Sequence, residues 1–167
     1  MQKRDKMATT NLSEYNTENV PDAKAFKFGI VVSNWNESIT EGLSNGAIKT
    51  LKQHGVKEEN ITRWEVPGSY ELVYGCKKML EVKELDALIA IGCVIRGETS
   101  HFDYVCDATN HGIKDLNLKQ NTPVIFCVLT DDTIQQSIDR SGGKHGNKGI
   151  ESAITAIKMA VIKNIKS

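Results

Sequence analysis

The sequence predicts a three-layer α/β fold, in which helices cover both faces of a four-stranded parallel β-sheet. Four apolar runs alternate with stretches whose apolar residues recur at helical spacing, as in proteins whose parallel strands are joined by right-handed crossovers. The run over residues 87–95 is apolar throughout except for Gly92, which is typical of a strand buried on both faces. All four runs end in polar or aromatic residues. In a parallel sheet these ends meet at the carboxyl edge, where ligands bind.

The expected order of elements is β-α-β-α-β-α-β-α-α. The strands are expected at residues 26–32, 61–66, 87–95 and 124–129. The first helix has an apolar stripe from Ile39 to Leu51, with Ser38 as its expected N-cap. Gly55 is placed to end that helix as a left-handed C-terminal cap.

The later helices follow the second, third and fourth strands. The second helix is expected to begin at residues 69–71, and a short one covers residues 132–139. The third begins after a turn at residues 97–100, and its apolar stripe is Phe102, Val105, Cys106 and Ala108. A loop rich in glycine and cations spans residues 140–149. The last helix is expected to bury one face, formed by Ile150, Ala153, Ile154, Ile157, Val161 and Ile165.

Length and charge limit the classes of protein. The 167 residues suit one domain, expected at residues 25–167 after a flexible N-terminal arm at residues 1–24. The 21 Lys and Arg balance the 21 Asp and Glu, which argues against nucleic acid as the main partner. A chain without net charge also has little repulsion between its copies, so self-association is plausible. No apolar stretch has the length of a membrane span, and the N-terminus lacks the apolar centre of a signal peptide.

The four cysteines have no C-x-x-C spacing. Cys93, Cys106 and Cys127 lie inside apolar segments, which favours reduced thiols over disulfides or a zinc site. Reduced thiols are typical of the cytoplasm, and we expect a cytoplasmic protein.

The ends of the four expected strands supply the candidate site. They are Trp35 with Asn36, residues 68–71, residues 97–101, and Thr130 with Asp131. The flat faces of Trp35 and Tyr70, close to backbone hydrogen-bonding groups, suit a heterocycle. Each also has a plainer interpretation, because a loop tryptophan or a tyrosine at the start of a helix is often an ordinary packing residue.

A second group of residues suits an anion. The turn at residues 97–100 offers backbone N–H groups at a helix N-terminus, and Arg140, Lys144 and Lys148 add cations that suit phosphate. His101 can carry a proton near neutral pH. The alternatives stay open at this point: a lone histidine at a helix start is often a surface residue, and residues 140–148 can form a solvated loop.

Other kinds of site find no support in the sequence. His54, His111 and His145 do not cluster with carboxylates at metal-ligand spacing, so no metal is expected. The G-x-S-x-G elbow of serine hydrolases is absent, as are the dinucleotide and P-loop glycine motifs. Taken by themselves, the residues indicate a phosphate-handling α/β enzyme.

Five motifs make the chain resemble the lumazine synthase family between residues 26 and 163. They are FGIVVS at residues 28–33, VPGSYE at 66–71, GCVIRGETSHFDYV at 92–105, PVIF at 123–126 and DRSGGKHGNKG at 139–149. The resemblance implies a flavodoxin-like sheet and an enzyme of the penultimate step of riboflavin biosynthesis. Such enzymes condense 5-amino-6-(D-ribitylamino)uracil with 3,4-dihydroxy-2-butanone 4-phosphate. The products are 6,7-dimethyl-8-ribityllumazine, phosphate and water, and no metal or organic cofactor takes part.

The resemblance also implies a role for individual residues. His101 would shuttle protons during imine formation and phosphate loss. The pyrimidine and its ribityl chain would be bound by Trp35, Asn36, Ser69, Tyr70, Glu71, Val94, Ile95 and Phe126. The phosphate would be bound by Glu98, Thr99, Arg140 and Lys148. In the family, a neighbouring subunit supplies the counterparts of Phe126, Arg140 and Lys148. This implies a homopentamer, free or built into an icosahedral shell of about 60 subunits.

Two features depart from the common family pattern. Trp35 and Tyr70 stand where phenylalanine is commoner, and both keep a flat face. Glu98 brings a carboxylate to the phosphate turn, which is tolerable only if its side chain points outward while its N–H points inward. Alternatives on the same fold are a flavin- or lumazine-binding module without turnover and a cage-forming structural protein. An electron carrier or a phospho-receiver is weaker, because Ser33 and Asn34 stand where a receiver needs an acidic pair.

Overall fold

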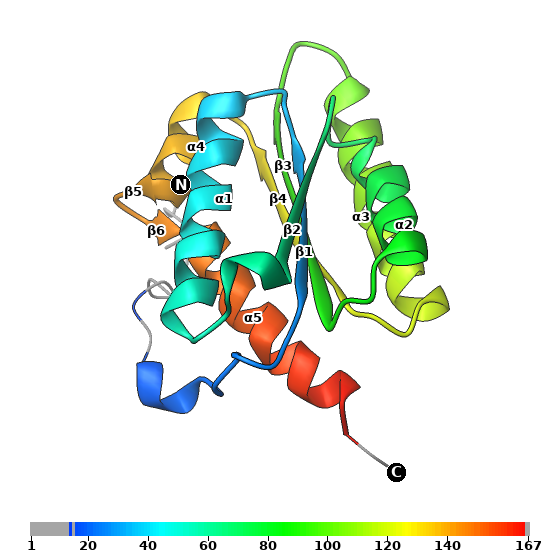
Figure 1. The fold of residues 1–167 in the computed structure, drawn as a ribbon. Coiled ribbons are helices and arrows are strands. Elements are labelled where there is room, and N and C mark those ends of the chain that lie inside the picture. Colours follow the sequence, from blue (N-terminus) through cyan, green and yellow to red (C-terminus); the bar gives the residue numbers. More distant parts are fainter. Residues whose placement is uncertain (1–13, 15, 166–167) are drawn as a thin grey trace, which may run out of the picture.

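A four-stranded parallel sheet forms the centre of the molecule, and helices lie on both of its faces (Figure 1). The computed structural model describes residue 14 and residues 16–165. The strands are β1 (Phe28–Ser33), β2 (Ile61–Val66), β3 (Ala87–Ile95) and β4 (Val124–Asp131), in the spatial order β2-β1-β3-β4. The helices are α1 (Glu37–Gln53), α2 (Leu72–Val82), α3 (His101–Lys119), α4 (Ile134–Arg140) and α5 (Lys148–Lys163). The predicted three-layer α/β fold is confirmed.

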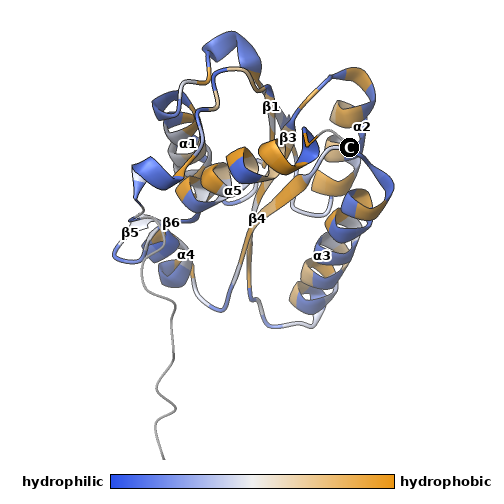
Figure 2. Cartoon of the chain, turned by 90° about the horizontal axis from the view of Figure 1, so that it is seen from below, coloured by the Kyte–Doolittle hydropathy of each residue, from blue (hydrophilic) through white to orange (hydrophobic). Residues whose placement is uncertain are grey.

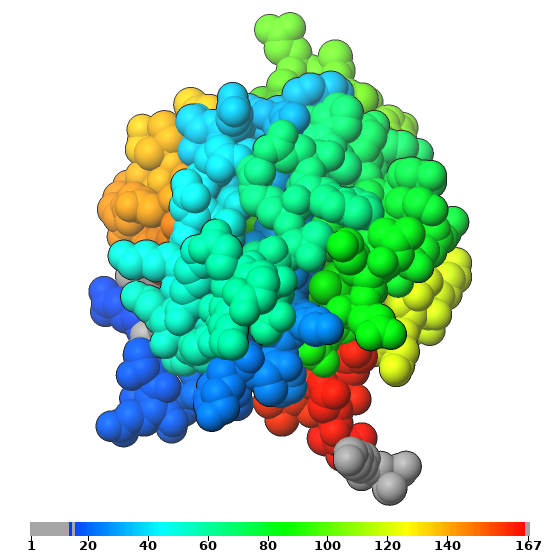
Figure 3. Space-filling model, viewed as in Figure 1, coloured from blue at the N-terminus to red at the C-terminus, as the bar shows by residue number. Residues whose placement is uncertain are grey.

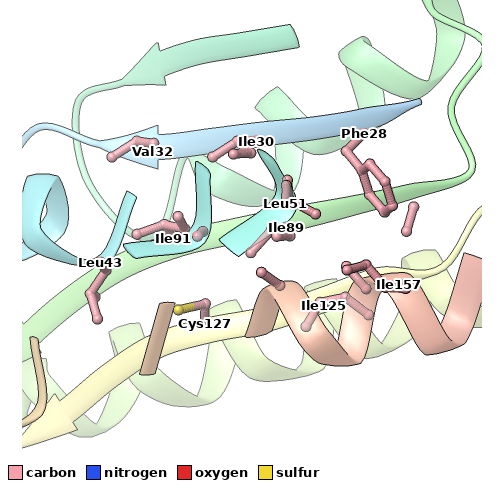
Figure 4. Packing of buried hydrophobic residues seen from close by; sticks show 14 of the residues in the cluster. Phe28, Ile30, Val32, Leu43, Leu51, Ile89, Ile91, Ile125, Cys127 and Ile157 are labelled. Atoms are coloured by element: carbon pink, nitrogen blue, oxygen red, sulfur yellow. The ribbon is translucent and has the colours of Figure 1, made fainter. Parts of the chain in front are cut away.

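One face of the sheet packs against α1 and α5. Ile30 of β1 and Ile89 of β3 point to this face, where they meet Leu43 and Leu51 of α1 and Ile157 of α5 (Figure 4). All five side chains are fully buried. Burying a side chain of this size stabilises the fold by roughly 1.5–3 kcal/mol.

The opposite face packs against α2 and α3. Val31 and Leu88 point to this face. Val31 is the neighbour of Ile30 in β1 and Leu88 is the neighbour of Ile89 in β3, and neighbouring side chains of a strand point to opposite faces of the sheet. The partners of Val31 and Leu88 include Leu72 and Met79 of α2. Because β1 and β3 are covered on both faces, their sequences are nearly continuous apolar runs, with only Gly29, Ser33 and Gly92 as exceptions.

Two strand boundaries differ from the prediction. β1 begins at Phe28 rather than at residue 26 and continues to Ser33, which pairs with Val66 of β2. β4 continues past residue 129 to Asp131, because it stays paired with β3 up to the register of Ile95 with Asp131. Pairing with a neighbouring strand, rather than apolar content, determines where each strand ends.

The start of α1 also differs from the prediction. Ser38 does not cap this helix. The N-cap is Asn36, whose φ of 61° and ψ of 44° lie in the left-handed region, and its side chain makes no capping hydrogen bond. At the other end Gly55 has φ of 92°, so its prediction as a left-handed residue after the helix is confirmed.

The buried faces of α3 and α5 are only partly as predicted. On α3, Phe102 is buried, whereas Ala108 of the predicted stripe is exposed and Val105 is half-buried. Val161 near the end of α5 is 38% exposed, because the end of the helix extends beyond the sheet (Figure 1). Ile165, predicted for the same face, lies after the helix ends at Lys163 and is 70% exposed. The face of α5 that packs inward is formed mainly by small residues, namely Gly149, Ser152, Ala153, Ala156 and Ala160.

The glycine-rich stretch after α4 is more ordered than the predicted loop. Its residues form an antiparallel hairpin of β5 (Ser141–Gly143) and β6 (Gly146–Asn147), and α5 begins directly after it at Lys148. Helix α4 begins at Ile134, two residues later than predicted. Thr133 and Gln136 form a reciprocal capping box there, which fixes the first turn.

The expected N-terminal arm lies mostly outside the described residues, which omit 1–13 and 15. Its described part contains a 3-10 turn, η1 (Thr17–Asn19), and a fully buried Ala23 whose N–H donates to the His54 carbonyl oxygen at 2.8 Å. A second 3-10 turn, η2 (Glu58–Asn60), precedes β2. Within the described part of the chain, no helix is long and apolar enough to cross a membrane.

Candidate active site

A cavity of about 780 Å³ opens at the carboxyl edge of the sheet. It lies between β1 and β3, where the strand order reverses, which is the usual ligand position in open parallel sheets. Its lining includes eight residues that the sequence predicted for one site: Trp35, Asn36, Ser69, Tyr70, Glu71, Val94, Ile95 and His101. The structure therefore brings together most of the predicted pyrimidine and ribityl site and the predicted proton carrier.

Trp35 and Tyr70 give the cavity its aromatic walls. Their side chains are 65% and 61% exposed, so neither is a core packing residue. The backbone of the β1–α1 turn is fixed, because the N–H of Trp35 donates to the Pro67 carbonyl oxygen at 3.0 Å. The indole is thus presented to the cavity from a turn that is tied to the end of β2.

Asn36 ties the same turn to β3. Its side-chain Nδ2 donates to the Cys93 carbonyl oxygen at 3.0 Å. This contact holds the residue in a left-handed conformation that asparagine tolerates better than most residues. Asn36 thus lines the cavity, and its hydrogen bond to β3 also stabilises the turn that carries Trp35.

Ser69 lies at the floor of the cavity and is 4% exposed. Its carbonyl oxygen accepts a hydrogen bond from Thr109 Oγ1 at 3.3 Å, which fixes the turn before α2 against α3. Its own Oγ has no hydrogen-bond partner among the described residues, and neither has the buried Oγ of Ser33. This Oγ is enclosed and packs against Gly92 of β3, where an added Cβ atom would come within 2.6 Å of it, so Ser69 faces the cavity through its other atoms.

Glu71 stiffens the turn from the other side. Its carboxylate accepts a hydrogen bond from the Gly68 N–H at 3.0 Å. Residues 69–71 form this turn, and α2 itself begins at Leu72, so the helix starts slightly later than predicted. Because the Ser69 carbonyl oxygen and the Glu71 side chain both hold the turn, its backbone is kept rigid beneath the ligand position.

His101 is the first residue of α3, as the strand–turn–helix pattern predicts. Its side chain is exposed and lines the cavity. Its N–H donates to Thr99 Oγ1 at 3.4 Å. This position gives the imidazole free access to whatever occupies the cavity.

The turn before His101 has the character expected of an anion site. Within the described residues, the backbone N–H groups of Gly97, Glu98, Thr99 and Ser100 donate no hydrogen bond. All four residues are exposed, and the turn protrudes at the top of the molecule (Figure 3). Unpaired N–H groups at the start of a helix attract negative charge.

Cys93 also lines the cavity, although the sequence did not predict it as a site residue. Its Sγ lies 3.4 Å from Ser137 Oγ, which donates to Asp131 Oδ2 at 2.7 Å. Burial raises the pKa of the Cys93 thiol, so the neutral form is favoured. All four cysteines of the chain are free thiols.

Sequence reasoning missed a third wall of the cavity, formed by α3. Tyr104, Val105, Asp107 and Ala108 line the cavity together with His101. Tyr104, Val105 and Ala108 follow His101 by three, four and seven residues, which is the spacing of one helix face. Counting helical positions from His101, instead of from the apolar Phe102, therefore identifies the face of α3 that lines the cavity.

The remaining predicted residues lie elsewhere on this chain. Phe126 and Lys148 line a second cavity of about 610 Å³ along β4, together with Thr130 and Asp131. β4 is an edge strand, with α5 and α3 on either side of it (Figure 2). Phe126 is 39% exposed on this strand. The two cavities have no lining residue in common.

The predicted phosphate cations are held in place by neighbouring groups. Arg140 donates from Nη1 to the Gln136 carbonyl oxygen at 2.9 Å. Lys148 Nζ lies 2.7 Å from Glu151 Oε2, and Lys144 Nζ lies 3.1 Å from Asp139 Oδ2. Arg140 lines neither of the two cavities. Within the described part of the chain, no three His, Cys, Asp or Glu residues are placed to hold a metal ion.

Comparison with known proteins identifies the family. The model of the 6,7-dimethyl-8-ribityllumazine synthase family matches residues 25–164. A protein of that name from Flavobacterium johnsoniae is 62% identical over 159 residues, which cover 94% of this chain and 84% of the relative. A relative of the same name from Christiangramia forsetii is 62% identical over 94% of this chain and 95% of its own length. Another from Porphyromonas gingivalis is 52% identical over 95% of this chain and 100% of its own length. The chain belongs to the 6,7-dimethyl-8-ribityllumazine synthase family.

Proposed function

We propose that this protein condenses 5-amino-6-(D-ribitylamino)uracil with 3,4-dihydroxy-2-butanone 4-phosphate to form 6,7-dimethyl-8-ribityllumazine. The amine attacks the ketone and water leaves as the imine forms. Phosphate is then eliminated, the second ring closes and a further water is lost. Family membership supports the reaction. The observation that carries it is the cavity in which the two aromatic walls, Ser69 and His101 come together.

The cavity suits the pyrimidine substrate. The rings of Trp35 and Tyr70 offer flat faces on which a heterocycle can stack. The turn at residues 69–71 lines the cavity, and its backbone groups can form hydrogen bonds with the ribityl hydroxyls. These contacts would orient the 5-amino group toward the turn before α3.

The turn at residues 97–100 suits the phosphate of the second substrate. Its free N–H groups lie beside His101, so a phosphate bound there would place the ketone near the imidazole. His101 would accept and return protons as the imine forms and the phosphate leaves. Holding both reactants in one orientation supplies much of the acceleration, because the reaction needs little further chemistry from the protein.

We further propose that the active site is shared between subunits. Phe126 and Lys148 lie along the β4 edge and Arg140 lies on α4, away from the cavity that holds His101. A ring in which the β4 side of one subunit faces the cavity of the next would complete every site with the same contact. Such head-to-tail contacts close into cyclic oligomers, and a homopentamer or an icosahedral shell of pentamers would satisfy them. The free thiols would suit a cytoplasmic protein.

The test is to mix the purified protein with both substrates. Lumazine fluorescence and phosphate release are followed together, and the uncatalysed reaction is subtracted. We expect both signals to rise in equal molar amounts. The absence of any acceleration by folded, oligomeric protein, together with tight flavin or lumazine binding, would replace this proposal with a binding module.

A further inference from the structure

Arg96 lies directly before the turn at residues 97–100, and three groups hold its guanidinium. Its Nη1 and Nη2 donate to the two carboxylate oxygens of Asp103 at 3.3 Å and 3.0 Å. Its Nε donates to Asp132 Oδ1 at 2.9 Å. The Cζ atom lies 4.2 Å from the centre of the Phe102 ring. We name these four residues, Arg96, Phe102, Asp103 and Asp132, the arginine clamp.

The arginine clamp joins three elements around the turn. Arg96 directly follows β3, and its backbone N–H donates to the Asp131 carbonyl oxygen at 2.9 Å. Phe102 and Asp103 belong to the first turn of α3, and Asp132 follows β4. The two ends of the turn are therefore fixed to each other and to the strand beside them, while Gly97 has open space around it.

The geometry argues against Arg96 as a phosphate ligand. The paired donors with which arginine binds a phosphate are already occupied by Asp103, and Nε is occupied by Asp132. Two carboxylates surround the single positive charge, and their hydrogen bonds raise the pKa of Arg96 further. The positive charge of Arg96 is thus balanced before any anion arrives.

We propose that Arg96 is a positioning residue for the reaction. It holds the N–H groups of the turn and the adjacent His101 in the arrangement that receives the phosphate and the ketone. This inference rests on the proposed function, since it concerns the same site. An exposed ion pair contributes little to stability by itself, so the effect of the clamp is expected in the reaction more than in unfolding.

The chain offers a matched control in Arg63. Its guanidinium also lies between two carboxylates, those of Glu41 and Glu65, and it donates to Glu65 Oε1 at 2.6 Å. It stands on β2 and does not line the cavity that holds His101. Arg63→Met therefore removes a comparable ion-pair cluster without touching the turn.

The experiment compares Arg96→Met, Arg96→Lys and Asp103→Asn with Arg63→Met in the full-length oligomer. For Arg96→Met we expect kcat to fall by about tenfold and the KM for the butanone phosphate to rise by about tenfold, because a displaced turn loses orientation. The KM for the pyrimidine should stay within about twofold. Arg96→Lys should rescue little, because lysine cannot form the paired contact. The double variant Arg96→Met/Asp103→Asn should be no worse than the more impaired single variant.

Three outcomes would overturn the inference. A lower KM for the butanone phosphate in Asp103→Asn would make Arg96 itself a phosphate ligand. Equal kinetics and equal loss of thermal stability in Arg96→Met and Arg63→Met would reduce the clamp to an ordinary surface ion-pair cluster. The third is unchanged deuterium exchange in Arg96→Met. We expect the N–H groups of Asp103 and Tyr104, which donate to the Ser100 carbonyl oxygen, to exchange faster in this variant and not in Arg63→Met. This last readout needs no substrate, so it tests the clamp even if the wild-type protein forms no lumazine and the proposed function fails.

Discussion

The indole of Trp35 lies directly against Gly68. A Cβ atom added at Gly68 would come within 2.5 Å of indole Cε3 and 2.6 Å of Cζ3. Gly68 is buried and belongs to the turn that also fixes the Trp35 backbone. The missing side chain at position 68 therefore determines how closely the ring can approach the β2–α2 turn, and with it the width of the aromatic side of the cavity.

Gly68→Ala should displace the indole and weaken pyrimidine binding. Because the added methyl group meets the benzene part of the indole, we expect the KM for the pyrimidine to rise by roughly tenfold, or about 1.4 kcal/mol. The KM for the butanone phosphate should change little. In a Trp35→Phe background, which lacks the second ring, the same glycine substitution should cost clearly less. Equal losses in both backgrounds, from steady-state kinetics, would contradict the contact.

His101→Gln should slow the reaction without abolishing it. A general acid–base group contributes typically about 10²–10⁴-fold, so we expect kcat to fall within that range. Both KM values should remain similar, because the aromatic walls and the turn at residues 97–100 persist. The check is the steady-state rate across pH for both proteins. An unchanged rate with an unchanged pH profile would exclude the proton-carrying role.

Much of the fold and one half of the site could be predicted from local patterns. The β3 run, the turn after it and His101 at the start of α3 occupy one continuous stretch, so strand, turn and helix signals reinforce each other. The converging strand ends followed from parallel topology alone. Six of the eight predicted residues that line the cavity therefore follow from sequence order, whereas Val94 and Ile95 were implied only by the resemblance to the family.

The features that sequence reasoning missed depend on contacts between distant residues. Asn36 takes its left-handed conformation where its side chain reaches the Cys93 carbonyl oxygen in β3. The β5–β6 hairpin is held by Asn147, whose Nδ2 donates to the carbonyl oxygens of Gly42 in α1 and Ser141. Tyr104 enters the cavity because tertiary packing decides the rotation of α3. No local pattern specifies the contacts of Asn36 and Asn147, whereas the spacing of Tyr104 from His101 gives a partial signal.

Gly149→Ala should destabilise the fold. Gly149 lies where α5 crosses α1, and a Cβ at this position would collide with the Leu43 carbonyl group. Separating the two helices costs about 1–3 kcal/mol of unfolding free energy, as overpacking does elsewhere. Urea unfolding at a fixed protein concentration measures the loss. Lys158→Ala, an exposed change on the same helix, should stay within about 0.5 kcal/mol of wild type, and an equal effect of both variants would contradict the close approach.

Asp139 should contribute to stability at neutral pH and lose this contribution in acid. The hydrogen bond from Gln135 Nε2, at 2.9 Å, and the nearby Lys144 hold the pKa of the Asp139 carboxyl below its ordinary value. A carboxyl group whose pKa is lower in the folded state stabilises the fold at pH values above its pKa in the unfolded chain, which is about 3.9. This stability contribution is lost as the pH falls through the pKa of the folded state. Asp139→Asn should thus be less stable than wild type at pH 7, and the difference should narrow below about pH 4.

The check for Asp139 is the melting temperature as a function of pH. Glu84→Gln, which changes an exposed carboxylate near the opposite edge of the sheet, serves as the control. Parallel curves for wild type and Asp139→Asn across the acid range would show that the charge of Asp139 does not stabilise the fold.

Two impaired variants should restore activity when their subunits are mixed. Under the proposed shared arrangement, Arg140→Ala and His101→Ala each disable a different half of the site, since Arg140 stands on α4 while His101 lines the cavity beyond β3. In randomly mixed rings, a site gains both intact halves when an Arg140→Ala subunit supplies His101 and its neighbour supplies Arg140. That arrangement occurs at about a quarter of the contacts in an equal mixture, so about a quarter of wild-type activity should return.

The mixing experiment requires that the subunits exchange, which co-expression or joint refolding achieves. The matched control combines His101→Ala with Lys148→Ala, which should also recover activity because Lys148 lies with Phe126 on the β4 side. Combining Arg140→Ala with Lys148→Ala should recover none, because both changes disable the same half. If instead each subunit held a complete site, the activity of every mixture would equal the summed activities of its two variants, and the shared arrangement would be wrong.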